Sequence, residues 1–191
     1  MKLLILVLLT FTFFPVQQDQ LLTITLKNNT AAEKSAQAQL ERITKTYDVT
    51  KWIFTFEVVI NDDDFIPHSH PKLTLNSRYL ADDLKQLSTF LHEEIHWWAE
   101  GRSKEIELAI EDFKKIYPQV PTGKEGGAHD TYSTYLHLVV CHLELEAMRS
   151  LVGEAQAIKV MSEWQHYRWI YDKVLNDPVV KKINEKYGLR I

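Results

Sequence analysis

Two histidines four residues apart, with a glutamate directly after the first, dominate the chemistry that this sequence offers. The segment His92-Glu93-Glu94-Ile95-His96 has the pattern H-E-x-x-H. On a helix, residues four apart share one face, so both imidazoles reach one metal ion. Glu93 is then placed to hold a water at the metal and to accept its proton. The pattern predicts Zn²⁺ as the cofactor and hydrolysis of a peptide or protein substrate as the reaction, with Glu93 as the general base.

A catalytic zinc usually has a third protein ligand and keeps one position for water. Glu144 is the first candidate, because its neighbours at helical spacing are all apolar: Val140, Cys141, Ala147 and Met148. A carboxylate on such a face is costly to bury unless it is paired or binds a metal. We therefore expect Glu144 to be the third ligand, with pairing to a base such as Arg78 as the structural alternative. His137, two helical turns earlier on the same face, is the third ligand or a donor to the oxyanion of the reaction. The structural alternative is a partly buried histidine that is satisfied by a backbone carbonyl.

The other candidates have more ordinary interpretations. Tyr132 and Tyr135 are alternative donors to the oxyanion, by their position in the chain. Asp130 is expected to cap the helix that follows it. The remaining histidines are expected at the edge of the core or in exposed loops, with His129 as a weaker ligand candidate: His68, His70, His129 and His142.

The histidine pair lies in a helix that we predict over Asp82–Glu100. Leucines, an isoleucine and a tryptophan recur there at spacings of three and four, which is typical of a helix with one face on the core: Leu84, Leu87, Leu91, Ile95 and Trp98. His92 and His96 flank this stripe, so we expect them half-buried at the floor of a cleft.

The remaining elements give a small sheet followed by helices. Strands are predicted over Leu21–Lys27, Trp52–Ile60 and Lys72–Tyr79, and helices over Thr30–Tyr47, Ser103–Tyr117, Thr131–Val152, Gly153–Leu175 and from Pro178 onward. This order predicts one α+β domain, with the small sheet packed on the active-site helix and a mostly helical C-terminal half.

Composition limits the class of protein. The chain has 191 residues, 45% of them hydrophobic, and a net charge of -4 without a basic cluster, so a nucleic-acid partner is not expected. Cys141 is the only cysteine, so a metal must be held by histidines and carboxylates. A basic start and an apolar stretch over Leu3–Phe14 predict a secretory signal peptide over residues 1–20. We expect an exported chain, periplasmic or secreted, whose mature domain (21–191) has no stable membrane span.

At these residues the chain resembles the zincin metallopeptidases, and among them the gluzincins, whose third zinc ligand is a glutamate on a downstream helix. Glu144-Leu145-Glu146-Ala147 matches the E-x-x-A pattern of several such families. The resemblance implies that Leu73–Asn76 is a sheet edge to which substrate adds by backbone pairing. Ala99 and Arg102 stand where a metzincin has glycine and histidine, so that branch is excluded.

Two alternatives remain open on the sequence. The chain could be an exported zincin-like domain that holds a metal or a partner without catalysis, because a motif does not prove turnover. It could also be a binding or structural protein without a metal, in which His92 and His96 are surface residues.

Overall fold

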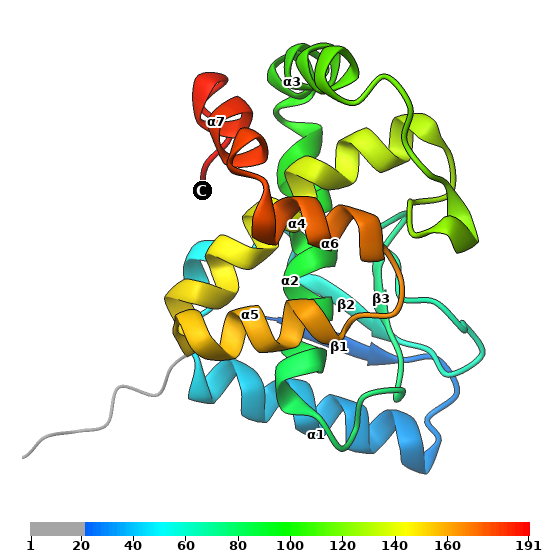
Figure 1. The fold of residues 1–191 in the computed structure, drawn as a ribbon. Helices are drawn as coiled ribbons and strands as arrows, with labels where there is room; N and C mark the ends of the chain where they lie inside the picture. The colour runs from blue at the N-terminus through cyan, green and yellow to red at the C-terminus, as the bar shows by residue number, and fades with distance from the viewer. Residues whose placement is uncertain (1–21) are drawn as a thin grey trace, which may run out of the picture.

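The computed structural model describes residues 22–191, and within them a parallel three-stranded sheet precedes seven α-helices (Figure 1). The strands are β1 (Thr23–Leu26), β2 (Glu57–Ile60) and β3 (Leu73–Leu75). The helices are α1 (Ala31–Thr46), α2 (Asp83–Glu100), α3 (Ser103–Ile116), α4 (Thr131–Val152), α5 (Glu154–Glu163), α6 (Arg168–Asn176) and α7 (Pro178–Lys186). The predicted α+β class is confirmed, whereas the predicted signal peptide lies outside the described residues.

The sheet has the order β1-β2-β3 with all strands parallel. Parallel neighbours need a connection that returns the chain to the starting end of the sheet. Helix α1 provides this return between β1 and β2. It starts with a capping box in which Thr30 Oγ1 accepts from the Glu33 N–H at 3.1 Å and Glu33 accepts from the Thr30 N–H at 3.3 Å. Between β2 and β3 the loop 61–72 makes this return, and residues of the loop also line the cavity described below.

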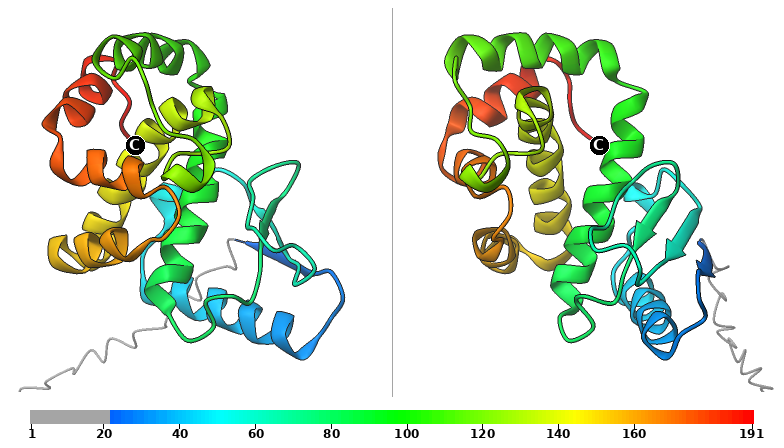
Figure 2. Two further views of the ribbon diagram at one scale, coloured as in Figure 1. Left: turned by 45° about the vertical axis from the view of Figure 1, so that its right-hand side comes forward. Right: turned by 90° about the vertical axis from the view of Figure 1, so that its right-hand side faces the viewer.

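Helix α2 runs between the sheet with α1 and the helices of the C-terminal half (Figure 2, right). Its predicted stripe is confirmed, since Leu87, Leu91 and Ile95 are fully buried. Because α2 has neighbours on both sides, it also buries polar residues on its other faces, including His92 and Glu93. Asp82 caps the helix by accepting from the Lys85 N–H at 3.0 Å. The element that carries the H-E-x-x-H pattern is therefore held rigidly in the middle of the protein.

The strand predicted over Trp52–Ile60 is half its expected length. Only Glu57–Ile60 is extended in the sheet, and Thr50–Trp52 forms a 3₁₀ turn. The cause is Glu94, a fully buried carboxylate on α2, which accepts the backbone N–H groups of Phe54 at 2.7 Å and Thr55 at 3.0 Å. These donors are thus used by a side chain and not by a neighbouring strand, a tertiary effect that overrides β propensity.

The expected substrate edge at Leu73–Asn76 is already occupied at Thr74. The Thr74 N–H donates to the His68 carbonyl at 2.7 Å, and the Thr74 carbonyl accepts from the His68 N–H at 3.0 Å. The loop 61–72 has folded back along the outer side of β3, which is the edge strand of the sheet. The expectation that substrate pairs with β3 at this position is therefore wrong.

The helix predicted over Gly153–Leu175 is interrupted. Helix α5 ends at Glu163, and the chain turns through Trp164–Tyr167 before α6 begins at Arg168. Tyr167 has φ 52°, in the left-handed region that non-glycine residues seldom adopt. The turn brings an aromatic segment back over α2. Among the residues that the structure describes, none of the helices has the length and apolar character needed to cross a membrane.

Candidate metal centre

Three imidazoles from two helices converge at one point. His92 and His96 come from α2 and His137 from α4, and each offers a ring nitrogen within 4.8 Å of the others. The ring centroids are 5.0 Å apart for His92–His96, 5.3 Å for His92–His137 and 5.1 Å for His96–His137. Three imidazole nitrogen donors in a near-equilateral triangle suit a tetrahedral Zn²⁺ that keeps its fourth position open.

Two of the three rings have a fixed orientation. His92 Nδ1 lies 2.9 Å from Glu144 Oε2, and His137 Nδ1 lies 2.6 Å from the Ser133 carbonyl oxygen. In the neutral imidazole, each acceptor accepts a hydrogen bond from Nδ1–H, which leaves Nε2 as the ring nitrogen with a free lone pair. Histidines that bind metals almost always donate their other ring N–H in this way, to a carboxylate or a backbone carbonyl. The donor set therefore has the chemistry of a metal site.

Glu144 lies behind His92 and not beside His96. Its side chain is 1% exposed and is bonded by three donors: the Ser88 hydroxyl, His92 Nδ1 and the Tyr171 hydroxyl at 3.0 Å. Within residues 22–191, His92, His96 and Glu144 do not form a group whose ligand atoms all lie within 4.8 Å of one another. The geometry favours His137 as the third ligand. The buried carboxylate of Glu144 accepts hydrogen bonds from His92, Ser88 and Tyr171. Arg78, the partner expected in the structural alternative, is not among these donors.

A second group, His92 with Cys141 and Glu144, also has its ligand atoms within 4.8 Å of one another. All three residues are buried, and three of the lone pairs of Glu144 are already engaged by protein donors. Burial raises the pKa of the Cys141 thiol, which disfavours the thiolate that would bind a metal. This group therefore fixes the orientation of the His92 ring, through the hydrogen bond from Nδ1 to Glu144, and is a poorer metal site than the three histidines.

The groups around His92 favour the protonated, positively charged form of its imidazole ring. Burial alone lowers the pKa of His92, but its contacts with Cys141 and the Glu144 carboxylate together raise that pKa well above the ordinary value. Burial, reinforced by the charge of His92, lowers the pKa of His96 far below the ordinary value and that of His137 to about 3. His96 and His137 are thus neutral, as metal ligands must be.

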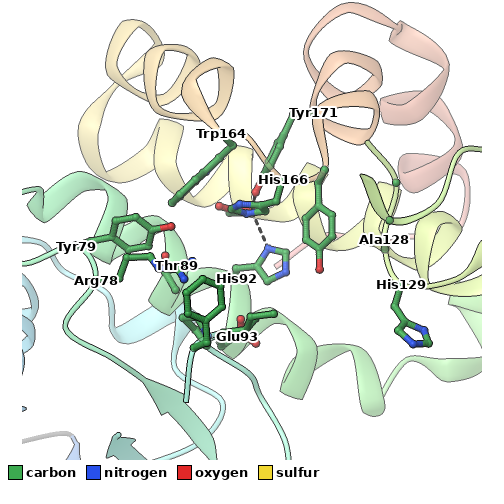
Figure 3. Close-up of a pocket in the computed structure, with 17 residues that line it drawn as sticks. Arg78, Tyr79, Thr89, His92, Glu93, Ala128, His129, Trp164, His166 and Tyr171 are labelled. Atoms are coloured by element: carbon green, nitrogen blue, oxygen red, sulfur yellow. Dashed lines mark hydrogen bonds and ion pairs between the residues drawn. The ribbon is translucent and has the colours of Figure 1, made fainter. Parts of the chain in front are cut away.

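Glu93 lies beside the histidines and faces a cavity of about 450 Å³. The side chain is 7% exposed, and burial raises its pKa to about 7 while the charge of His92 opposes this rise. In Figure 3, His92 and Glu93 form the centre of the cavity, Arg78 and Tyr79 lie on one side of it, and Ala128 and His129 on the other. A carboxyl group with this pKa both accepts and returns a proton near neutral pH.

The turn between α5 and α6 supplies residues that the sequence did not reveal as part of the site. The Tyr167 ring lies 4.5 Å from the His137 ring and 6.0 Å from the His92 ring, and it lines the cavity together with Trp164 and His166. Burial raises the pKa of Tyr167, so its hydroxyl keeps its proton. The sequence contains one indication of this wall of the cavity, a cluster of a histidine and aromatic residues at 164–167. That cluster lies inside the segment predicted as helix.

The other predicted candidates lie elsewhere. The Tyr132 hydroxyl donates to Glu107 at 2.6 Å, and the Tyr135 hydroxyl donates to the Tyr117 carbonyl at 2.5 Å, so neither is directed at the histidines. Asp130 caps α4 as predicted, accepting from the Ser133 N–H at 2.7 Å. His142 is buried in the core, and the His129 side chain is 92% exposed at the rim of the cavity.

His68 and His70 are not simply exposed loop residues. The His70 ring stacks on Trp97 with 4.3 Å between centroids and pairs with Glu100 at 2.6 Å. His68 bonds to Thr74, as described above, and is near enough to Glu93 to lower the pKa of its carboxyl group. Both residues help to fix the loop 61–72 beside the C-terminal half of α2.

Comparisons of the chain with models of known protein families, with curated proteins and with solved structures give no match. The interpretation of the site therefore depends on its residues and their geometry.

Proposed function

We propose that this protein is a zinc-dependent peptide hydrolase in which His92, His96 and His137 hold the metal. The observation that carries the proposal is the convergence of three imidazoles from α2 and α4, two of them oriented through Nδ1, next to a buried glutamate that faces a cavity. Glu144 takes the role of positioning residue, because it fixes the His92 ring through Nδ1.

His92, His96 and His137 would hold Zn²⁺, which would supply a Lewis acid able to lower the pKa of water to about 7 and to polarise a carbonyl group. Glu93 holds the attacking water through its carboxylate, accepts the proton at a carboxylate oxygen and delivers that proton to the leaving amine. Its pKa of about 7 suits both transfers, since neither protonation state is strongly favoured at neutral pH.

Tyr167 is placed to donate its hydroxyl proton to the oxyanion that forms from the scissile carbonyl. Its ring contacts both His92 and His137, and its left-handed backbone holds the side chain at the cavity wall. Strained backbone that persists at a cavity is a recurrent feature of functional sites. One well-placed donor of this kind typically contributes roughly 10²- to 10³-fold in rate.

The test combines metal content with turnover on a mixed peptide library, read by mass spectrometry. We expect about one zinc per chain and defined cleavage products from the natural protein. Glu93→Gln should keep the zinc and lose turnover, because the amide cannot accept the proton. Glu185→Gln, at an exposed site on α7, is the matched control and should retain activity.

Two results would contradict the proposal. Full turnover in Glu93→Gln would refute the role of Glu93. Stoichiometric zinc with no cleavage of any peptide by the natural protein would favour the alternative of an exported domain that binds a metal or a partner without catalysis.

A further inference from the structure

Arg78 is a cation at the mouth of the cavity, and it has no counter-charge within the part of the chain that the structure describes. It follows β3 on the turn that leads to α2, and it lines the same cavity as His92 and Glu93 (Figure 3). Among residues 22–191 it forms no ion pair, and its guanidinium donates no hydrogen bond to the protein. All of its side-chain donors are free for a ligand.

The guanidinium is nevertheless held in place. It lies over the Phe65 ring, 4.1 Å from its centroid. Buried Asn76 joins the two segments: its Nδ2 donates to the carbonyls of Asp64 at 2.9 Å and Phe65 at 3.3 Å, and its Oδ1 accepts from the Arg78 N–H at 3.1 Å. The contact with Phe65 and the hydrogen bonds of Asn76 therefore fix the position of Arg78 relative to the cavity.

The charge around Arg78 is locally positive in a chain whose net charge is -4. An adjoining hollow of about 580 Å³ shares Arg78, Tyr79 and Trp164 with the cavity and is also lined by Lys85 and Lys124. Lys85 is paired with Glu163 at 3.3 Å, whereas Lys124 forms no ion pair with the described residues. Two uncompensated cations thus border this side of the cavity, and they attract an anion.

We infer that Arg78 determines the specificity of the site by binding a carboxylate of the substrate, an inference that rests on the proposed hydrolase function for its substrate class. Arginine presents a planar fork that matches a carboxylate through two parallel hydrogen bonds. The ring of Phe65 is 78% exposed beside it and offers an apolar surface to the neighbouring substrate side chain.

The size of the cavity limits where this carboxylate lies. Arg78 and Glu93 both line this cavity of about 450 Å³, and each residue of an extended peptide spans about 3.3 Å. The carboxylate recognised by Arg78 therefore lies within a few residues of the bond that is attacked. It is either the C-terminal carboxylate of the peptide or the side chain of an acidic residue.

The experiment measures peptide binding by calorimetry in a Glu93→Gln background with a chelator present, so that neither turnover nor a metal contributes. Three probes of equal length separate the sources of the carboxylate: acetyl-Ala-Phe-Phe as the free acid, the same peptide as its C-terminal amide, and acetyl-Ala-Phe-Asp as its amide. We expect at least one carboxylate probe to bind about tenfold more tightly than the uncharged amide. Tight binding of the first points to a terminal carboxylate, and tight binding of the third to an acidic side chain.

The added substitution Arg78→Gln should remove this preference to within about twofold, and Arg78→Lys should restore part of it through charge alone. Arg102→Gln is the matched control, because Arg102 is also exposed, lies over an aromatic ring (Trp98, 5.6 Å) and is outside the cavity. Equal binding of all three probes, or a preference that survives Arg78→Gln, would overturn the inference.

The result is independent of the test of the proposed function. Peptide cleavage by the natural protein without any preference for a carboxylate would refute the role of Arg78 alone. Carboxylate binding that depends on Arg78, in a protein that cleaves nothing, would refute the hydrolase and leave an anion-binding site.

Discussion

Glu93→Gln should stabilise the metal-free protein at alkaline pH. The Glu93 carboxyl group is buried, and its pKa in the folded protein is about 7 compared with an ordinary value of 4.5. Between these two values the folded protein binds a proton that the unfolded chain does not. The contribution of Glu93 to the free energy of unfolding therefore falls as the pH rises from about 4.5 to about 7, and stays at the lower level above it.

The size of the effect follows from the two pKa values. The interval from 4.5 to about 7 corresponds to about 3 kcal/mol, at about 1.4 kcal/mol for each tenfold change in proton affinity. Glutamine resembles the neutral carboxyl group and has no such penalty. At pH 8 the variant should be about 3 kcal/mol more stable than the natural protein, which for a chain of this size is a rise in Tm of roughly 6–12 °C.

The assay is urea unfolding of both proteins with a chelator, at pH 8 and at pH 4.5. The gain in stability should be present at pH 8 and small at pH 4.5, and Glu185→Gln, the exposed control, should show no gain at either pH. Excess zinc should reduce the gain at pH 8, because a nearby cation favours the ionised carboxylate. A variant that is equally stable or less stable at pH 8 would refute the burial of Glu93 as the origin of its raised pKa.

Three further substitutions test the supports of the site and of the fold. Tyr171→Phe removes one of the donors to Glu144 and should weaken zinc binding by about tenfold, measured by competition with a chromophoric chelator, while the fold is kept by circular dichroism. Glu94→Ala leaves two partly buried backbone N–H groups without their acceptor and should lower the free energy of unfolding by about 2–4 kcal/mol in urea, whereas Glu94→Gln should lower it much less. Gly127→Ala would place its Cβ 1.8 Å from the Pro121 carbonyl oxygen, so a fall in Tm of several degrees is expected, and an unchanged Tm would refute that packing.

The sequence was sufficient to predict the helices that carry the site. The apolar stripe of α2 and the cap at Asp130 correctly predicted α2 and α4, because local periodicity and capping decide these elements. The strand Trp52–Ile60 was overpredicted, since Glu94 on a distant helix takes two of its donors. The sequence does not predict the interruption of the helix at Tyr167, because this residue adopts a left-handed backbone without a glycine or proline at that position.

The candidate site was predictable in its residues but not in all their places. The pattern H-E-x-x-H located His92 and His96 correctly on one buried helix, and the apolar face around Glu144 correctly indicated burial. Whether the side chain of Glu144 or that of His137 completes a group with His92 and His96 depends on the angle at which α4 crosses α2. Helical spacing in the sequence does not give this angle. No chemical pattern in the sequence indicates Arg78, because its significance comes from its place at the cavity and from having no ionic partner among the described residues.

The most direct test of the metal centre is zinc affinity in the natural protein, in His137→Ala and in Glu144→Gln, measured by chelator competition in one series. We expect about one zinc per chain in the natural protein, loss of stoichiometric zinc in His137→Ala, and retained zinc with roughly 10- to 100-fold weaker affinity in Glu144→Gln. Zinc that is lost in Glu144→Gln and kept in His137→Ala would show that Glu144 is the ligand. No zinc in any of the three proteins, even after zinc is supplied, would contradict the metal centre itself.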